Sequence, residues 1–410
     1  MNIKKIIWSP INHKIVKSTT KYTKPRSCPI CKSEDYFTIL KFKNYQFFTD
    51  SRISKRINLI NVQCKKCFAI YQNPAYTFRG LKVLFNEAGM SYGSTIKSKK
   101  DQINWLKKNK LIFKNINVLD VGCYDGSFLK LLPKKLNKHG VDIDKKIILN
   151  SQKKHKNLKL FCGNFETFSS KKKFDLITMM HVLEHLPNPV KVLKNLKKNC
   201  INFGKLVIEV PIIENHMFES LDGFITTQHM THFSKNSLFN AIHQSGWKVC
   251  KYKKIKKYNG FRVICEKNNK NDENLKILKR DLINYEKYKL KNEKNKNRII
   301  KKLSNFNLNK KNILMCGGLH LELIYQLTSL LREITNKKFI IIDNDRNKVN
   351  KKWRGVPIYG QNSIKYLGNL NKYKFIICSY PYQDEIFKEL IKLEVEKKNI
   401  FKFYSKIQRY

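Results

Sequence analysis

Apolar, strand-like runs alternate with helical stretches between about residues 90 and 265, and this alternation constrains the fold more than any other feature. The clearest runs lie at 117–121, 139–143, 174–178 and 205–210. Strands that alternate with helices favour an α/β fold built on a doubly wound parallel sheet. Further runs at 312–316, 338–343 and 374–378 predict a second, smaller α/β domain of the same Rossmann-like kind.

The length of 410 residues exceeds the roughly 150 of a typical domain, so we expect several domains. Residues 270–308 are highly charged and contain neither Gly nor Pro, which predicts a helical connector. The predicted division is a basic lead-in at 1–20, a zinc-binding domain at 21–85, a first α/β domain at 90–267, the connector at 268–308 and the C-terminal Rossmann-like domain at 309–410.

The formal net charge is +52, from 83 Lys and Arg against 31 Asp and Glu. Such an excess is typical of proteins that bind nucleic acid or an anionic membrane surface. Here 72 of the cations are Lys and they are spread over every segment, whereas specific phosphate and base recognition favours Arg on a clustered face. We therefore favour a compositional origin, keep nucleic acid as an alternative partner, and expect the basic surface to attract phosphorylated small molecules.

Two further features bear on location. No apolar run approaches the roughly 18 residues of a membrane span, and the N-terminus lacks an apolar stretch followed by a cleavage site. We therefore predict a cytoplasmic protein without a membrane span. Seven of the 11 cysteines occur singly, which fits reduced core residues rather than a disulfide framework.

The other four cysteines form two C-x2-C pairs that are separated by 32 residues. Two such pairs suit tetrahedral zinc, because each tight turn brings two thiolates to one ion. With four cysteine ligands no position stays open, so the predicted zinc is structural and stabilises a unit of about 60 residues. Two unrelated pairs, or a redox pair, are the alternative. The predicted ligands are Cys28, Cys31, Cys64 and Cys67.

A glycine-containing turn follows the first strand of the α/β region. Asp120 lies near the end of that strand, Gly122 and Gly126 follow, and a helix begins near Ser127. Glycines in this turn let a ligand approach the backbone, and the helix N-terminus offers amides to a carboxylate or phosphate. About 20 residues later the second strand ends at Asp142, whose carboxylate suits ribose hydroxyls.

Residues 120–126, 140–142 and 174–189 together resemble the class I S-adenosylmethionine-dependent methyltransferases. The resemblance implies that Asp120 and Gly122 line the methionine end of the cofactor, Asp142 the ribose, Asn164 and Phe165 the adenine, and His181 the strand edge beside the sulfonium. Cys123, Gly126 and Ile143 complete the predicted cofactor-binding set. Glu184 and His185 are expected to open a helix and to be structural.

The strand at 205–210 is followed by about 20 residues without clear periodicity, and a long loop at a strand's carboxyl end is where catalytic groups often lie. Within it, residues 226–234 contain His229 and His232, three residues apart. A neutral histidine can remove a proton from a methyl acceptor near pH 7, so His229 is the candidate base, with Gln228 and His232 as further catalytic candidates. A loop histidine hydrogen-bonded to the backbone is the alternative.

The order of a four-cysteine unit, a methyltransferase core and a C-terminal α/β domain resembles the three-domain sugar C-methyltransferases, which act on nucleotide-linked 4-keto deoxysugars. The family's loop reads approximately Tyr-His-Glu-His-x-Ser-Tyr-Phe-Ser, and of its first four residues this chain keeps only the second histidine, as His229. Gln228 takes the glutamate's place and His232 that of the second tyrosine. The resemblance implies a nucleotide sugar or related glycan precursor as substrate, with C-, O- or N-methylation open.

Two other functions stay open at this point. An RNA or protein methyltransferase fits the positive charge, and a non-catalytic S-adenosylmethionine-binding protein fits the altered loop. Arg262 is either a phosphate contact or a plain surface arginine. The C-terminal domain repeats the strand–glycine–acid pattern with residues 316–320 and Asp343, and is either a nucleotide site or a structural lobe.

Overall fold

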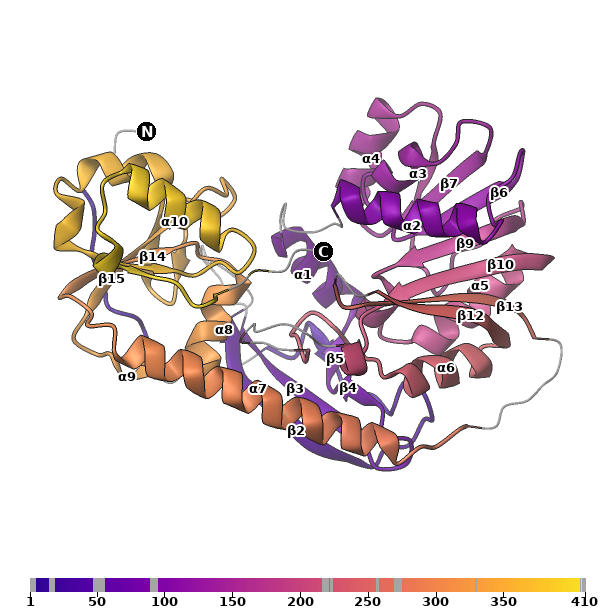
Figure 1. Cartoon of the computed structure of the whole chain (residues 1–410), viewed down its shortest axis with the longest axis horizontal. Coiled ribbons are helices and arrows are strands. Elements are labelled where there is room, and N and C mark those ends of the chain that lie inside the picture. Colours follow the sequence, from indigo (N-terminus) through magenta and orange to yellow (C-terminus); the bar gives the residue numbers. More distant parts are fainter. Residues whose placement is uncertain are drawn as a thin grey trace.

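A computed structural model describes residues 5–14, 19–46, 56–88, 95–215, 221, 224–255, 258–268, 275–328, 330–405 and 407. The chain forms two α/β bodies, with an N-terminal β-rich unit packed below and between them (Figure 1). The 25-residue helix α7 (Arg280–Ser304) runs from one body to the other. It is the core of the predicted connector, although it begins about ten residues later than the charge pattern suggested.

The largest sheet has seven strands in the order β12-β13-β10-β9-β6-β7-β8, so the α/β expectation is confirmed. All neighbouring pairs are parallel except those of β13, which runs antiparallel to β10 and β12. The chain order reverses at β6, where ligands of open α/β sheets bind because the flanking loops diverge. The strands are β6 (Asn117–Val121), β7 (Asn137–Asp142), β8 (Lys159–Cys162), β9 (Phe174–Met180), β10 (Cys200–Val210), β12 (Trp247–Ile255) and β13 (Gly260–Lys267).

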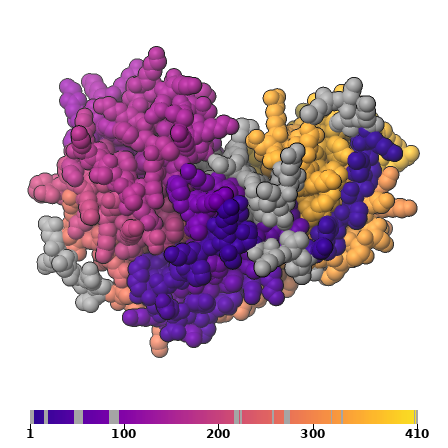
Figure 2. Space-filling model, turned by 180° about the vertical axis from the view of Figure 1, so that it is seen from behind, coloured from indigo at the N-terminus to yellow at the C-terminus, as the bar shows by residue number. Residues whose placement is uncertain are grey.

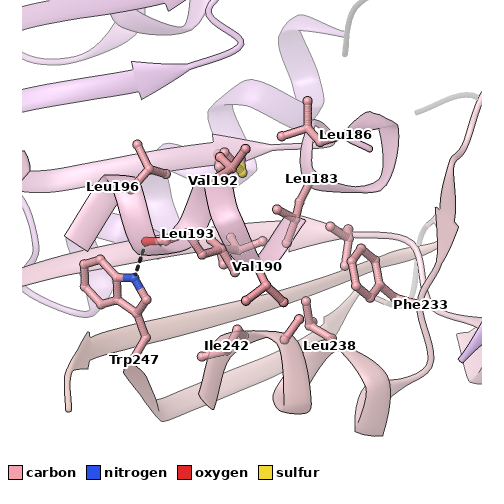
Figure 3. Packing of buried hydrophobic residues seen from close by; sticks show 14 of the residues in the cluster. Leu183, Leu186, Val190, Val192, Leu193, Leu196, Phe233, Leu238, Ile242 and Trp247 are labelled. Carbon is pink, nitrogen blue, oxygen red and sulfur yellow. Dashed lines mark hydrogen bonds between the residues drawn. The ribbon is translucent and has the colours of Figure 1, made fainter. Parts of the chain in front are cut away.

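Local sequence explains where the helices around this sheet begin. Ser234 caps α6 (Lys235–Gln244) in a capping box with Ser237, and Pro189 opens α5 (Pro189–Asn199). Apolar residues of α5 and α6 meet in one core around Trp247, whose indole N–H donates to the Leu193 carbonyl at 2.9 Å (Figure 3). The other helices of this body are α2 (Ile96–Lys108), α3 (Ser127–Leu131) and α4 (Lys145–Lys154).

The N-terminal unit is built on a sheet with the order β11-β4-β3-β2. Three of its strands come from the unit itself, but β11 (Thr231–His232) comes from the loop that follows β10. The unit's own elements are β1 (Thr23–Lys24), β2 (Tyr36–Gln46), β3 (Arg56–Cys64), β4 (Ile70–Gln72), β5 (Ala75–Tyr76) and α1 (Phe78–Ala88). The loop that follows β10 is therefore part of the N-terminal sheet.

The C-terminal body holds a six-stranded sheet with the order β16-β17-β15-β14-β18-β19, in which β16 alone among these strands is antiparallel to its neighbour. Its strands are β14 (Lys311–Met315), β15 (Lys338–Asp343), β16 (Lys352–Trp353), β17 (Val356–Gly360), β18 (Lys374–Ile377) and β19 (Ile400–Phe401), and its helices are α8 (Leu319–Leu327), α9 (Leu330–Glu333) and α10 (Gln383–Lys392).

Residues 5–13 of the basic lead-in lie on this C-terminal body (Figure 2), whereas Lys14 and Thr19 are hydrogen-bonded to Arg56 of the unit that follows in sequence. Ser9 forms a β-bridge with Phe339, and the Trp8 ring stacks on Tyr373 at 5.1 Å. The chain thus starts at one end of the molecule and returns there for its last domain. Among the described helices, none is long and apolar enough to cross a bilayer.

Replacing Trp247 by Ala should lower the free energy of unfolding of the α/β body by about 3–5 kcal/mol, because the ring is fully buried and leaves a cavity. The matched control is Phe203→Ala, since Phe203 is an aromatic residue of the same sheet that is 91% exposed. This control should change stability by less than about 0.5 kcal/mol. Urea denaturation followed by circular dichroism measures both, and equal effects would contradict the packing described above.

Candidate active site

A cavity of about 1560 Å³ lies at the carboxyl ends of β6, β7 and β9. The N-terminal unit closes one side through residues such as Tyr76, and the C-terminal body contributes His320 and Tyr380. The cavity exceeds the roughly 300–1,000 Å³ of a pocket for one drug-sized ligand, so it has room for two molecules. Ten of the 12 residues predicted for cofactor binding and catalysis line it: Asp120, Gly122, Cys123, Asp142, Ile143, Asn164, Phe165, His181, Gln228 and His229.

The turn between β6 and α3 brings backbone to the cavity wall. Gly122 has φ +75° and its N–H donates to the Val141 carbonyl at 2.8 Å. A Cβ at this position would lie 2.3 Å from Cγ2 of Val182, so the close approach requires glycine. Gly126 also has φ +74°, but it packs against Leu158 and does not line the cavity.

Two carboxylates flank this turn. Asp120 is 4% exposed and accepts a hydrogen bond from Oγ1 of Thr178 at 2.7 Å; burial raises its pKa to about 7. Asp142 accepts hydrogen bonds from the amides of Tyr124 at 2.9 Å and Asp144 at 3.0 Å, and burial raises its pKa as well. Asp142 thus fixes the glycine turn in place while its carboxylate still borders the cavity.

The predicted adenine contacts lie beyond β8 at the same rim. Phe165 is buried and borders the cavity, which suits a flat apolar ring. Asn164 is exposed, and its Oδ1 accepts a hydrogen bond from the Glu166 amide at 2.9 Å. Its amide nitrogen is therefore the part that can reach a ligand.

His181 lies at the end of β9 with φ +55°. Its Nε2 is 3.0 Å from Oε1 of Glu209 and its Nδ1 is 3.4 Å from Oε1 of Glu184. Burial would lower the pKa of His181, but the two carboxylates outweigh it and raise the pKa to about 10. A cation is therefore held beside the predicted methionine end of the cavity.

Glu209 on β10 is the centre of a buried polar cluster that sequence reasoning missed. The carboxylate is fully buried and accepts hydrogen bonds from Tyr258 at 2.6 Å and from Nε of Arg262. Burial would raise the pKa of Glu209, but the hydrogen bond and charge of His181 outweigh it, followed by Arg262, and the pKa falls to about 2. Arg262 is itself fully buried, so it is neither a surface arginine nor a phosphate contact.

The loop at 226–232 brings two of the three predicted catalytic residues to the cavity. Gln228 and His229 line it, and Nδ1 of His229 is buried without a hydrogen-bond partner among the described residues. Burial lowers the pKa of His229 well below its ordinary value, so the ring is neutral. His232 lies elsewhere: it is buried, its Nε2 is 2.9 Å from Oδ1 of Asn61, and it does not line the cavity.

The N-terminal unit fixes this loop through hydrogen bonds to the loop's backbone carbonyls. Tyr76 donates its hydroxyl to the Thr227 carbonyl at 3.0 Å, and the amide of Gln72 donates to the Met230 carbonyl at 2.9 Å. The guanidinium of Arg26 reaches the Met230 carbonyl as well. The position of His229 therefore depends on the four-cysteine unit.

The four predicted zinc ligands converge at one point of that unit. Sγ of Cys28 is 3.6 Å from Sγ of Cys67, and Sγ of Cys31 is 3.5 Å from Sγ of Cys64. All four sulfur atoms lie within 4.8 Å of one another, and three of the residues are buried. Thiolates at this spacing fit a tetrahedral zinc ion that is closed to substrate.

Glu184 and His185 differ from the sequence expectation. They do not open a long helix but occupy the single turn η2 (Leu183–His185), and α5 begins four residues after it. Both side chains are buried and line the cavity. Nothing in the strand or helix pattern could separate a helix start from a short turn here.

Replacing Gly122 by Ala should weaken binding of S-adenosylmethionine at least tenfold, because the new Cβ collides with Val182 and moves the turn. Gly368→Ala is the matched control, since Gly368 also has a positive φ (+66°) but nothing within 4 Å of a new Cβ. It should cost only about 1 kcal/mol of backbone strain and leave binding unchanged. Isothermal titration calorimetry measures the two affinities, and equal losses would disprove the steric argument.

Replacing Cys64 by Ser should release zinc and also abolish methyl transfer, because the loop that carries His229 is hydrogen-bonded to the same unit. The singly occurring, exposed Cys162 provides the control Cys162→Ser. Mass spectrometry measures the zinc content, and protease cleavage within 226–232 measures whether the loop has left the N-terminal unit. A Cys64→Ser protein without zinc but with full turnover would refute the link.

The comparisons with known proteins agree with this geometry. Residues 97–252 match a family model described as a methyltransferase domain. A ubiquinone biosynthesis O-methyltransferase of Coxiella burnetii is 33% identical over 109 residues, which is 24% of this chain and 45% of that protein. The chain thus spans less than half the length of the curated relatives it matches.

Solved structures with a similar arrangement include an S-adenosylmethionine-dependent methyltransferase from Clostridium acetobutylicum, with 12% identity, a TM-score of 0.36 and coverage of 47% of this chain and 99% of that one. Another from Aquifex aeolicus has 19% identity and a TM-score of 0.34, and the match covers 42% of this chain and 98% of that one. The family match confirms the expected methyltransferase for the first α/β body: this chain contains a class I S-adenosylmethionine-dependent methyltransferase domain.

Proposed function

We propose that the protein transfers a methyl group from S-adenosylmethionine to a small anionic acceptor, a nucleotide-linked sugar or related glycan precursor. The observation that carries this proposal is the cavity, which has room for two molecules and is walled by all three parts of the chain. A concave site that is lined from three parts of the chain favours a small acceptor over RNA or a folded protein.

The cofactor half of the cavity is assigned to the strand ends of the methyltransferase domain. When bound, the cofactor supplies an electrophilic methyl group on a sulfonium. Gly122 allows its methionine part to approach the backbone, and Asp120 and the turn set by Asp142 offer carboxylates to its ammonium and ribose groups. The remaining predicted contacts are Cys123, Ile143, Asn164, Phe165 and His181.

The acceptor half is assigned to the loop and to lysines at the cavity wall. His229 and Gln228 face the cavity from the loop. Lys24 and Lys82 come from the N-terminal unit, and Lys145 and Lys146 from α4. A diphosphate linker would be attracted by these ammonium groups, which supports the anionic acceptor.

O-methylation of a small hydroxyl compound is the second candidate. The partial relatives carry the name of ubiquinone biosynthesis O-methyltransferases, which supports oxygen as the receiving atom. Both candidates need a group that takes up the acceptor's proton or stabilises its anion, and His229 is the side chain that we assign to this step.

The test follows a labelled methyl group from S-adenosylmethionine into nucleotide-sugar, quinone-precursor, RNA and protein fractions of the source cells. Label in the nucleotide-sugar fraction is the expected result. His229→Gln should reduce transfer at least 100-fold while the affinity for S-adenosylmethionine changes less than threefold, whereas Asp142→Ala should weaken that affinity at least tenfold. His243→Gln, which replaces an exposed histidine of α6, is the control.

Each other distribution of the label has one meaning. Label confined to the quinone-precursor fraction would favour the second candidate, and label confined to RNA or protein would overturn the small-acceptor proposal. Cofactor binding without label in any fraction would identify a non-catalytic binding protein.

A further inference from the structure

Three potential metal ligands, Glu184, His185 and His229, meet at the cavity wall where η2 touches the catalytic loop. Their ligand atoms lie within 4.8 Å of one another. The rings of His185 and His229 are perpendicular neighbours with centroids 4.8 Å apart. Glu184 and His185 come from the end of β9 and His229 from the loop, so two segments of the chain contribute to one point of the cavity.

The carboxylate of Glu184 is buried but accepts too few hydrogen bonds to compensate for the loss of water. The residue is 1% exposed, and neither carboxylate oxygen accepts a hydrogen bond within the described part of the chain. Glu184 forms an ion pair with His181 at 3.4 Å, but the same imidazole also pairs with Glu209 at 3.0 Å, so one cation serves two carboxylates. A buried carboxylate without hydrogen bonds costs several kcal/mol, which a bound cation would offset.

The two histidines are prepared to act as ligands. Nδ1 of His185 donates to the Gln228 carbonyl at 3.0 Å, so the lone pair of that ring lies on Nε2. A backbone carbonyl on the second ring nitrogen is the usual partner of a metal-bound histidine. Nδ1 of His229 is buried and accepts no hydrogen bond in the described structure.

We propose that Glu184, His185 and His229 bind a divalent cation of the zinc type in the acceptor half of the cavity. Two imidazoles and one carboxylate form a typical catalytic zinc set, in which the fourth position stays open for a substrate oxygen. This site differs from the four-cysteine site, where sulfur fills every position. The inference rests on the proposed methyltransferase function and names the acceptor as a molecule that presents an oxygen to the metal.

The cation, rather than a histidine base, would promote the loss of the acceptor's proton. An acceptor hydroxyl on the open position loses its proton to water more readily, because the cation stabilises the resulting anion. A lone pair of that oxygen then forms the bond to the methyl carbon, the bond between sulfur and methyl breaks, and its electron pair stays on sulfur. His229 thus holds the metal rather than the proton.

The test counts metal ions in the full-length protein. The wild type should bind two Zn²⁺ per chain, and Glu184→Gln and His229→Gln should each bind one. Cys64→Ser should bind none, because the loop that carries His229 is hydrogen-bonded to the four-cysteine unit. His320→Gln is the control, because His320 lines the same cavity outside the three-ligand group and should keep two. Circular dichroism confirms that each variant folds.

Cobalt substitution identifies which ion is lost. Co²⁺ on four thiolates gives intense sulfur-to-metal charge-transfer absorption, whereas Co²⁺ on two histidines and a carboxylate gives weaker d–d bands without it. His229→Gln should remove only the d–d bands of the second ion. One ion per chain in the wild type, lost in Cys64→Ser and kept in His229→Gln, would overturn the metal site. If that protein still transfers methyl groups, the proposed function stands without it, whereas two ions without transfer would overturn the function alone.

Discussion

The antiparallel pairing of β11 with β4 is the contact on which the active site depends. It is only two residues long, yet it joins the loop that carries His229 to the sheet of the four-cysteine unit. Hydrogen bonds from Tyr76 and Gln72 to loop carbonyls extend the pairing on either side of His229. A loop of this length would otherwise sample many conformations, because fixing each residue costs about 1–2 kcal/mol. The N-terminal unit is thus the scaffold of the acceptor site.

A second constraint lies beneath the cavity, in the buried cluster around Glu209. Its carboxylate is fully buried and accepts hydrogen bonds from Tyr258 and Arg262, while His181 lies at 3.0 Å. Such a cluster contributes little net stability, since desolvation of the charges offsets their attraction. It does fix the ring of His181, whose positive φ would be strained in a less constrained turn. We infer that the cluster serves to position the end of β9, and with it η2.

The sequence predicted the features that depend on local pattern. The strands 117–121 and 338–343 have the predicted bounds, and the four cysteines converge. Features that depend on contacts between distant segments were missed. Arg262 was predicted to be a phosphate contact or a surface arginine, because its partner Glu209 is 53 residues away. Glu184 was expected to be structural, because nothing nearby in sequence reveals a buried carboxylate without hydrogen bonds. The burial and the partners of Arg262 and Glu184 depend on the chain topology, which the periodicity of the sequence does not reveal.

The two metal-ligand groups differ in a way that matches their positions. The four cysteine sulfur atoms lie in the N-terminal unit away from the cavity, where a zinc ion with a closed coordination sphere would stabilise a sheet too small to be stable by apolar burial alone. The carboxylate and two imidazoles lie on the cavity wall, where the proposed cation would keep a position open toward the acceptor. Because β11 connects the two regions, the structural group determines whether His229 reaches the other two ligands at all. The proposed chemistry of the acceptor site therefore depends on the fold of the four-cysteine unit. The sheet of the methyltransferase domain alone would not hold His229 in place.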